Sequence, residues 1–294
     1  MNDKQIALFG EVLFDQFPDG QQVLGGAPFN VAWHLQAFGL KPCFISRVGC
    51  DANAEYIKHA MQTWGMTLKK LQTDTEHPTG VVQIHFDKNG EPHYDIMPNQ
   101  AYDFIATDQL DLATPYSIIY HGTLALRHSS SARTLETLKN SHHGKVFVDV
   151  NLRTPWWQLS ETHQLVHNAD WVKLNMEELI QLESSSYRFD QAMESFLAKH
   201  NLQVLVVTDG ENGATALTHS GEYIHVKPNI QLDVVDTVGA GDAFAAVLLL
   251  GLQRGWSLTL TMDRAQNFAS ALVTQRGAIV QDLNFYLPFI GDYR

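Results

Sequence analysis

From about residue 110 onward, short apolar runs rich in β-branched residues alternate with segments of helical periodicity. A tight turn cannot join two parallel strands, so a helix between successive strands indicates crossover connections within one parallel sheet. The strands of such a sheet are covered on both faces and are therefore apolar along most of their length. The sequence thus predicts an α/β fold with a largely parallel central sheet and helices on both of its faces.

The expected elements follow from periodicity and from turn residues. The expected strands are Ile6–Phe9, Cys43–Arg47, Val81–Phe86, Ser117–Tyr120, Val146–Val150, Trp171–Leu174, Val204–Thr208, Thr215–Thr218 and Tyr223–Val226. The expected helices are Pro28–Phe38, Ala52–Trp64, Ser130–Lys139, Glu177–Leu182, Asp190–His200, Asp242–Gln253 and Asp263–Thr274.

Two segments, about 12–24 and 80–102, interrupt this α/β pattern. Both have hairpin-like β patterns with turn signals and no helix between their strands. We expect them to form a small β lid beside the main sheet, and two separate surface hairpins are the alternative. No internal repeat or long linker interrupts the chain, so residues 1–294 are expected to form a single domain.

The 294 residues carry a net charge of −12, from 20 basic and 32 acidic side chains, and 45% of them are hydrophobic. This composition permits a sizeable core and argues against nucleic acid or an anionic membrane as a partner. Cys43 and Cys50 form no CxxC pair, so structural zinc is not expected. The start of the chain lacks a signal-peptide pattern, and the longest apolar stretch, about 243–250, is too short to cross a bilayer. We therefore expect a reduced, cytoplasmic protein.

The stretch VVDTVGAGDAF, from Val234 to Phe244, predicts a strand end, a glycine turn and the first turn of a buried helix. Gly239 and Gly241 permit a sharp bend and close approach of a ligand to the backbone. The N–H groups of a helix start form an anion site, and Asp242 would lie beside it. A kinase needs this combination, because a carboxylate takes the proton of an alcohol while amides hold the phosphoryl group. The alternative is that Asp242 only caps the helix.

Other polar residues occur near the expected ligand edge of the sheet. Asn30 follows two glycines at a predicted helix start, and Asp15 ends the first lid strand. Amide and carboxylate groups suit adjacent sugar hydroxyls, although Asn30 could instead be a helix cap and Asp15 a turn residue. Arg153 follows a buried strand and suits a sugar, a phosphate or a surface salt bridge.

Asn175 and Glu178 lie three residues apart, after the strand that carries Lys173. They therefore share one face of a helix start, where an acid and an amide can hold a hydrated Mg²⁺ beside a triphosphate. The same spacing fits a capping box between the two residues. The loop at 208–213 either borders a nucleotide or forms a simple β-turn.

These motifs follow one another in a recognisable order, from GGAPFN at 25–30 and DVNLR at 149–153 to VTDGENG at 207–213 and DTVGAGDAF at 236–244. In this combination the chain resembles the ribokinase-like carbohydrate kinases, the PfkB family, over essentially its whole length. GEVLFD, GGAPFN, DVNLR and AYDFI look most like the fructokinase branch. The resemblance implies a ribokinase-like α/β fold with a small β lid.

The resemblance also implies roles for individual residues. Asp242 would be the general base, and the amides of Gly239, Ala240 and Gly241 would hold the transferred phosphoryl group. The residues implied in sugar binding are Asp15, Gly26, Asn30 and Arg153. The residues implied near the nucleotide are Lys173, Asn175, Glu178, Thr208, Gly210, Gly213, Gln266 and Asn267. The residues implied in metal binding are Glu178, near Mg²⁺, and Asp236 with the carbonyl of Val238, for a monovalent cation such as K⁺.

The expected activity is transfer of a phosphoryl group from ATP to a primary hydroxyl of a keto-sugar, fructose first. A 2-keto-3-deoxygluconate kinase or another sugar kinase of the family is the nearest alternative, and a non-catalytic sugar- or nucleotide-binding regulator on the same fold is another. A Rossmann dehydrogenase and a P-loop NTPase are not supported, because GxGxxG and GxxxxGKS/T do not occur at the required places. ATP, Mg²⁺ and K⁺ are the expected cofactors. The exposed lid is expected to pair two copies into a homodimer.

Overall fold

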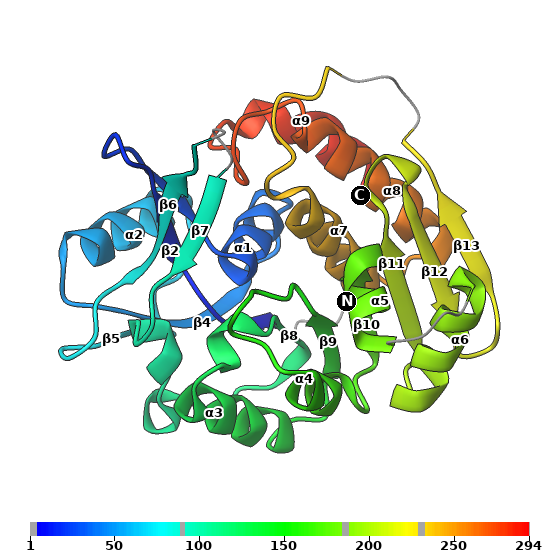
Figure 1. Cartoon of the computed structure of the whole chain (residues 1–294), viewed down its shortest axis with the longest axis horizontal. Helices are drawn as coiled ribbons and strands as arrows, with labels where there is room; N and C mark the ends of the chain where they lie inside the picture. The colour runs from blue at the N-terminus through cyan, green and yellow to red at the C-terminus, as the bar shows by residue number, and fades with distance from the viewer. Residues whose placement is uncertain (1–4, 89–91, 184–187, 229–232, 294) are drawn as a thin grey trace.

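The computed structural model describes residues 5–88, 92–183, 188–228 and 233–293 of the chain. In these ranges a nine-stranded sheet lies at the centre, in the order β13-β12-β11-β10-β9-β8-β1-β4-β5, with helices on both faces (Figure 1). Its strands are β1 (Gln5–Phe9), β4 (Cys43–Val48), β5 (Leu71–Thr73), β8 (Tyr116–His121), β9 (Lys145–Asp149), β10 (Trp171–Asn175), β11 (Val204–Thr208), β12 (Ala214–Thr218) and β13 (Tyr223–Val226). The predicted α/β class is confirmed.

Seven neighbouring strands, from β11 to β5, run parallel, as the alternating sequence pattern predicts. The last two strands differ, because β12 and β13 run antiparallel to their neighbours. The prediction of parallel strands with crossover helices is therefore wrong for residues 214–226. The physical reason is the short connection at 209–213, which can close a hairpin but cannot hold a crossover helix.

The helices divide between the two faces according to the core clusters in which their apolar side chains lie. One face carries α1 (Ala27–Ala37), α2 (Ala52–Thr63), α7 (Ala240–Arg254), α8 (Leu258–Leu272) and α9 (Leu283–Asp292). The other face carries α3 (Ser129–Asn140), α4 (Leu159–Val166), α5 (Met176–Glu183) and α6 (Phe189–His200). The sequence did not predict α4, α9 or β5, and α8 begins at Leu258 rather than at Asp263.

The interior position of α7 follows from its composition. The run from Ala243 to Leu250 is buried on every side, which requires neighbours all around the helix. α1 and α8 supply them, and α1 lies directly beside α7 (Figure 1). The start of α1 is thereby brought next to the start of α7.

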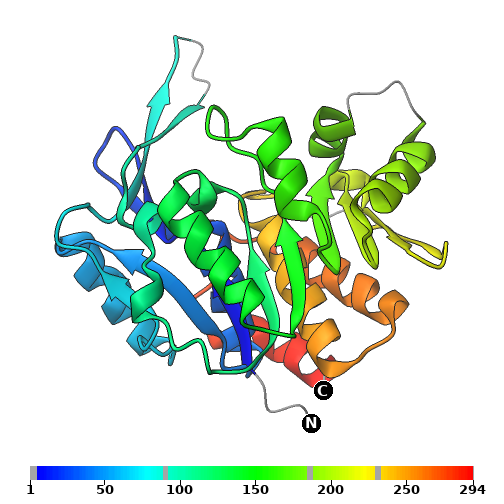
Figure 2. The same cartoon turned by 90° about the horizontal axis from the view of Figure 1, so that it is seen from below.

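A second sheet of four strands stands beside the main sheet, in the order β3-β2-β6-β7. Its strands are β2 (Leu13–Gln16), β3 (Gln22–Gly25), β6 (Gly80–Phe86) and β7 (Pro92–Ile96). Parallel pairing of β2 with β6 joins the two predicted lid segments into this one small sheet, so they are not two separate hairpins. Figure 2 shows the β6–β7 hairpin, in cyan, projecting away from the main sheet. Residues 89–91 of the second segment, like 1–4 and 294, lie outside the described residues.

The carboxyl ends of the parallel strands lie along one edge of the main sheet. The chain passes from β1 to β4 on one side of β1 and to β8 on the other, so the strand order reverses at β1. Ligands of open α/β sheets bind outside the carboxyl ends of the strands at such a reversal. Among the described helices, none has both the length and the apolar composition required of a membrane span.

Candidate active site

The glycine turn and the helix start that the sequence predicts lie at residues 237–242, where α7 begins directly after Gly239. Gly239 has a φ of 79°, a left-handed conformation that favours glycine. A Cβ at this position would also collide with Ala278. The turn therefore requires glycine for backbone reasons, apart from any ligand.

The backbone amides of this turn remain largely unused by the protein. The Ala240 N–H contacts the Thr237 carbonyl at 3.3 Å. Within the described residues, the N–H groups of Gly239, Gly241 and Asp242 have no protein acceptor. Three donors at a helix start are thus free to hold an anion. Of the three amides that the resemblance implied, Ala240 is the least available.

The Asp242 side chain faces α1, where Asn30 Nδ2 donates a hydrogen bond to Asp242 Oδ2 at 2.8 Å. Burial raises the pKa of Asp242 to about 6. The Asn30 bond and the positive charges of Lys173 and Arg153 lower this pKa, whereas the charge of Asp149 raises it. A helix start favours the ionised carboxylate, but the loss of contact with water is the larger effect here. Asp242 is therefore a carboxylate that is ionised at neutral pH and can still accept a proton.

A buried ion pair lies under the turn. Lys173 Nζ is 2.9 and 3.0 Å from the two carboxylate oxygens of Asp149, which also accepts a hydrogen bond from the Tyr120 hydroxyl at 3.1 Å. Burial opposes the charge of Lys173, but Asp149 holds the pKa of Lys173 above its ordinary value. A Cβ on Gly241 would lie 3.5 Å from Lys173 Nζ. An ammonium group thus faces the free amides.

Two acceptors converge beside Gly25. A Cβ on Gly25 would lie 3.8 Å from Asp15 Oδ2 and 4.0 Å from Asn30 Oδ1. In the described part of the chain, the buried Asn30 Oδ1 has no hydrogen-bond partner. Burial raises the pKa of Asp15 to about 6, and the exposed Arg153, which acts on both Asp15 and Asp242, lowers it. The structure therefore brings together four of the residues implied in catalysis and sugar binding.

Asn175 and Glu178 make the contacts of a capping box at the start of α5. Glu178 Oε2 accepts the Asn175 N–H, and Asn175 Oδ1 accepts the Glu178 N–H, each at 2.8 Å. The second carboxylate oxygen of Glu178 accepts the Leu152 N–H at 2.6 Å. Burial raises the pKa of Glu178, and the two backbone donors lower it. The capping alternative thus describes what this pair does within the protein. Asn175 also pairs with Thr208 in the register between β10 and β11.

The remaining residues implied near the nucleotide lie farther along the sheet. Gly210 and Gly213, with φ of 48° and 95°, shape the tight connection between β11 and β12, in agreement with the β-turn alternative. Gln266 is buried on α8 and donates to Ser270 Oγ at 3.1 Å, whereas Asn267 is exposed. In the described ranges, no hydrogen bond links these residues to the group around Asp242.

Asp236 connects the turn before α7 to the segment after α8. Its two carboxylate oxygens accept the N–H groups of Val238 at 3.0 Å and of Gly277 at 2.9 Å. Among the described residues, no group of three or more His, Cys, Asp or Glu side chains is arranged to hold a metal ion. The cation role of Asp236 and Val238 stays a prediction.

Sequence reasoning assigned no role to Glu11, which follows β1 at the point where the strand order reverses. Its exposed fraction is only 3%, and a Cβ on Gly26, whose φ is 112°, would lie 2.7 Å from the Glu11 carbonyl oxygen. A charged residue two positions after a strand that is apolar from Ile6 to Phe9 was the one available signal. Gly26 thus permits close packing of two backbone segments beside Glu11.

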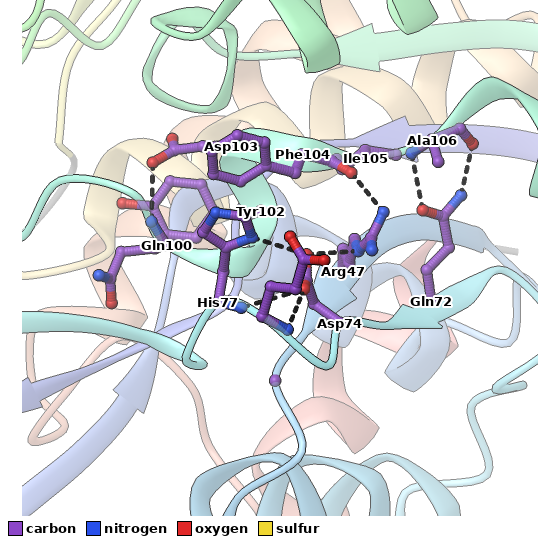
Figure 3. A network of polar contacts seen from close by, with 12 residues as sticks. Arg47, Gln72, Asp74, His77, Gln100, Tyr102, Asp103, Phe104, Ile105 and Ala106 are labelled. Atoms are coloured by element: carbon purple, nitrogen blue, oxygen red, sulfur yellow. Dashed lines mark hydrogen bonds and ion pairs between the residues drawn. The ribbon is translucent and has the colours of Figure 1, made fainter.

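Polar contacts join the base of the small sheet to the main sheet. Arg47, on β4, lies with Nε 2.8 Å from Asp74 Oδ2 and donates through Nη1 to the Phe104 carbonyl at 2.7 Å (Figure 3). Asp51 accepts the N–H and the hydroxyl of Thr79, directly before β6, at 2.8 and 2.7 Å. These contacts fix the segments through which the chain enters and leaves the β6–β7 hairpin.

Comparison with known proteins agrees with this arrangement. The model of the pfkB family carbohydrate kinases matches residues 3–283. A fructokinase from Salmonella typhimurium is 29% identical, over 97% of this chain and 99% of its own length. An aminoimidazole riboside kinase from Salmonella typhimurium strain LT2 is 26% identical, over 97% and 92%.

Solved structures show the same fold. A fructokinase from Xylella fastidiosa with bound ATP superimposes with a TM-score of 0.86 at 22% identity, over 99% of both chains. A fructokinase variant from Vibrio cholerae O395, with fructose, ADP and potassium ion bound, gives 0.81 at 25% identity, over 97% of both chains. The fold is ribokinase-like, and the chain is a phosphotransferase that belongs to the pfkB family of carbohydrate kinases.

Proposed function

We propose that this kinase transfers the γ-phosphoryl group of ATP to a primary hydroxyl of a keto-sugar, with fructose as the first candidate. The observation that carries the proposal is the Asp242 carboxylate, held by Asn30 beside the free amides at the start of α7. The hydroxyl oxygen forms a bond to the γ-phosphorus while the bond to the bridging oxygen of ADP breaks. Asp242 accepts the hydroxyl proton, and the amides with Lys173 stabilise the negative charge on the phosphoryl oxygens.

Glu178 and Asp236 are the proposed cation residues. Both carboxylate oxygens of Glu178 already accept backbone N–H groups, so Glu178 fits Mg²⁺ through water molecules rather than as a direct ligand. Mg²⁺ would neutralise charge on the phosphates of ATP. Asp236 keeps lone pairs beyond its two backbone contacts, and with the Val238 carbonyl it fits a monovalent cation near the turn. The bound potassium ion of the Vibrio cholerae fructokinase supports this expectation.

The acceptors around Gly25 support a neutral polyol. Asp15 and Asn30 present oxygen atoms, which suit donated hydroxyl hydrogens and oppose a carboxylate. An acid such as 2-keto-3-deoxygluconate would depend on Arg153, an exposed cation whose charge acts on Asp15. The name of the Salmonella fructokinase supports fructose, and the name of the aminoimidazole riboside kinase indicates that a relative acts on a different substrate.

We also propose that the small sheet acts as a lid over the sugar and as the contact surface of a homodimer. Asp15 lies on β2 of this sheet, so its position relative to Asn30 on α1 depends on how the sheet sits. Closure around the sugar would exclude water and limit hydrolysis of ATP.

The test is a panel of sugars with ATP and Mg²⁺, in which ADP release is followed with and without K⁺. Fructose should give the highest kcat/KM, and omission of Mg²⁺ should abolish turnover. A strong preference for 2-keto-3-deoxygluconate or for a riboside would replace fructose as the substrate. Tight sugar binding without ADP release, measured by calorimetry, would contradict catalysis by this site.

A further inference from the structure

Glu11 has a buried carboxylate oxygen that lacks a partner. Burial raises the pKa of Glu11 to about 7, while the charges of Arg153 and Arg127 lower it and the charge of Asp242 raises it. Among the described residues, Glu11 Oε2 is buried and accepts no hydrogen bond. An unpaired buried oxygen destabilises a protein by more than an ordinary hydrogen bond stabilises it. Glu11 Oε2 is therefore open to a hydrogen-bond donor from outside the chain.

Arg127 has a buried donor that also lacks a partner. Its Nε and Nη2 donate to the two carboxylate oxygens of Asp103, each at 2.8 Å, and its Cζ lies 4.4 Å from the centre of the Trp156 ring. Asp103 is itself held by the Gln100 N–H (Figure 3). In the described ranges, the third nitrogen, Nη1, is buried and donates to nothing. The guanidinium group is thus rigidly placed with one donor unused.

The two unpaired groups belong to one electrostatic environment. Glu11 and Arg127 each alter the pKa of the other, and Asp242 acts on Glu11. Tyr102, whose hydroxyl accepts a hydrogen bond from Arg127, also feels the charge of Glu11. A Cβ on Gly80 would lie 2.7 Å from Tyr102 Cε1 and 2.8 Å from the carbonyl oxygen of the residue after Glu11, so the segment that carries Glu11 lies beside the ring that Arg127 contacts. The pair therefore lies between the end of β1 and the base of the small sheet.

We propose that Glu11 and Arg127 form a subsite that binds one hydroxyl group of the acceptor sugar, other than the hydroxyl that is phosphorylated. The sugar hydroxyl donates its hydrogen to Glu11 Oε2 and accepts a hydrogen bond from Arg127 Nη1, so one group satisfies both unpaired atoms. A phosphate does not fit, because its charge would lie against the Glu11 carboxylate. This assignment rests on the proposed sugar kinase activity and adds the residues that select the sugar.

The test compares the parent enzyme with Glu11→Gln, and with Glu55→Gln as a control that removes an exposed carboxylate. For the sugar that the parent phosphorylates best, Glu11→Gln should raise KM by ~10- to 100-fold, the range expected for a hydrogen bond to a charged group. The KM for ATP should change by less than about twofold, and Glu55→Gln should match the parent. Arg127→Lys keeps the charge but cannot reproduce the planar fork, so it should raise the same KM.

A series of singly deoxygenated sugars identifies the hydroxyl. One deoxy analogue should lose ~10-fold or more in kcat/KM with the parent and a clearly smaller factor with Glu11→Gln, because the amide replaces the charge-assisted hydrogen bond to that hydroxyl with a neutral one. The other analogues should lose similar factors with both enzymes. Equal losses for every analogue in both enzymes would overturn the subsite.

The Tm of the sugar-free enzyme also tests the proposal, because a Glu11 that only stabilised the fold would give a lower Tm when replaced. The folded-state pKa of Glu11, about 7, lies above its ordinary value of 4.5, so stability is lost as pH rises between these values. Glu11→Gln should therefore raise the Tm of the sugar-free enzyme at pH 8, and a lower Tm would contradict a group reserved for ligand.

Sugar binding is also measured in an Asp242→Asn background, because this substitution removes a second carboxyl that titrates in the same pH range. The other charged or titratable groups facing Glu11 are Arg153, Arg127, Tyr102 and Tyr120. By calorimetry, affinity should weaken as pH falls from 8 to 5.5. The added Glu11→Gln change should remove the part of this dependence that arises near pH 7 and leave the part that arises near pH 6 from Asp15. An unchanged pH dependence in the double variant would refute the proposal. A parent enzyme that phosphorylates no sugar would instead refute the proposed function.

Discussion

As the proposed general base, Asp242 needs a negative charge at a position where burial opposes that charge. Replacement by Asn keeps the shape of the side chain and removes the proton acceptor. We predict that Asp242→Asn folds normally and loses ~1,000-fold in kcat, a typical scale for loss of a general base. Circular dichroism and a coupled ADP assay measure the two effects. Near-normal turnover would eliminate Asp242 as the base.

The same carboxyl predicts how activity depends on pH. Because the folded-state pKa of Asp242 is raised to about 6, protonation removes the base as pH falls through this value. Asp15 and Glu11, with pKa values of about 6 and 7, titrate in the same range, so the observed step belongs to the set of coupled groups. We expect kcat/KM to rise with pH between about 5 and 7. A profile that stays flat down to pH ~4.5 would contradict this assignment.

At the scale of elements, α7 provides a matched pair of glycines at its two ends. Gly239 and Gly255 have left-handed φ values of 79° and 69°, but a Cβ would collide with Ala278 only at Gly239. Gly255→Ala should reduce the free energy of unfolding by ~1 kcal/mol, from backbone strain alone, and keep activity. Gly239→Ala should reduce it further and abolish turnover, because the free amides move. Urea unfolding and kcat distinguish the two, and equal effects at both sites would contradict this view of the turn.

The ends of β9 and β10 are joined by the ion pair of Asp149 and Lys173, which raises the question of whether Lys173 serves stability or catalysis. Lys173→Met leaves Asp149 buried without its cation, and we predict a loss of ~3 kcal/mol in unfolding free energy. The double variant Lys173→Met, Asp149→Leu should recover much of this stability but remain inactive, since no ammonium faces Gly241. Recovery of activity together with stability would assign Lys173 a structural role only.

At the scale of the whole molecule, the sequence predicted the parallel core and the start of α7 because both depend on local patterns. The turn at Gly239 and the apolar run from Ala243 are such patterns. The direction of β12 was mispredicted because the alternating pattern was extended over it, although the expected strands at 204–208 and 215–218 leave too few residues between them for a crossover helix. Glu11 was missed for another reason. Its lack of a partner exists only after β1, the segment that carries Arg127 and the small sheet are assembled, and no spacing in the sequence records it.

The outer end of the small sheet predicts how two copies associate. Ile84 and Tyr94 pair across β6 and β7 and so share a face, and Phe86 lies on this face two residues beyond Ile84. Ile84 is buried, whereas Phe86 and Tyr94 are 52% and 55% exposed. The described part of the chain therefore leaves the outer part of this apolar face open to solvent. A second copy of the chain would cover this exposed apolar face, because each copy presents the same face to the other.

We therefore expect sedimentation equilibrium to give twice the 33.0 kDa mass of the chain. Phe86→Glu with Tyr94→Glu should yield monomers, because two carboxylates would have to be buried in the interface. Leu287→Glu is the matched control, since Leu287 is 58% exposed and belongs to α9 rather than to the small sheet. If the lid and the interface are one surface, the monomeric variant should also show a raised KM for the sugar. A monomeric parent chain at micromolar concentration would refute the dimer, and a dimer that survives both substitutions would place its interface elsewhere.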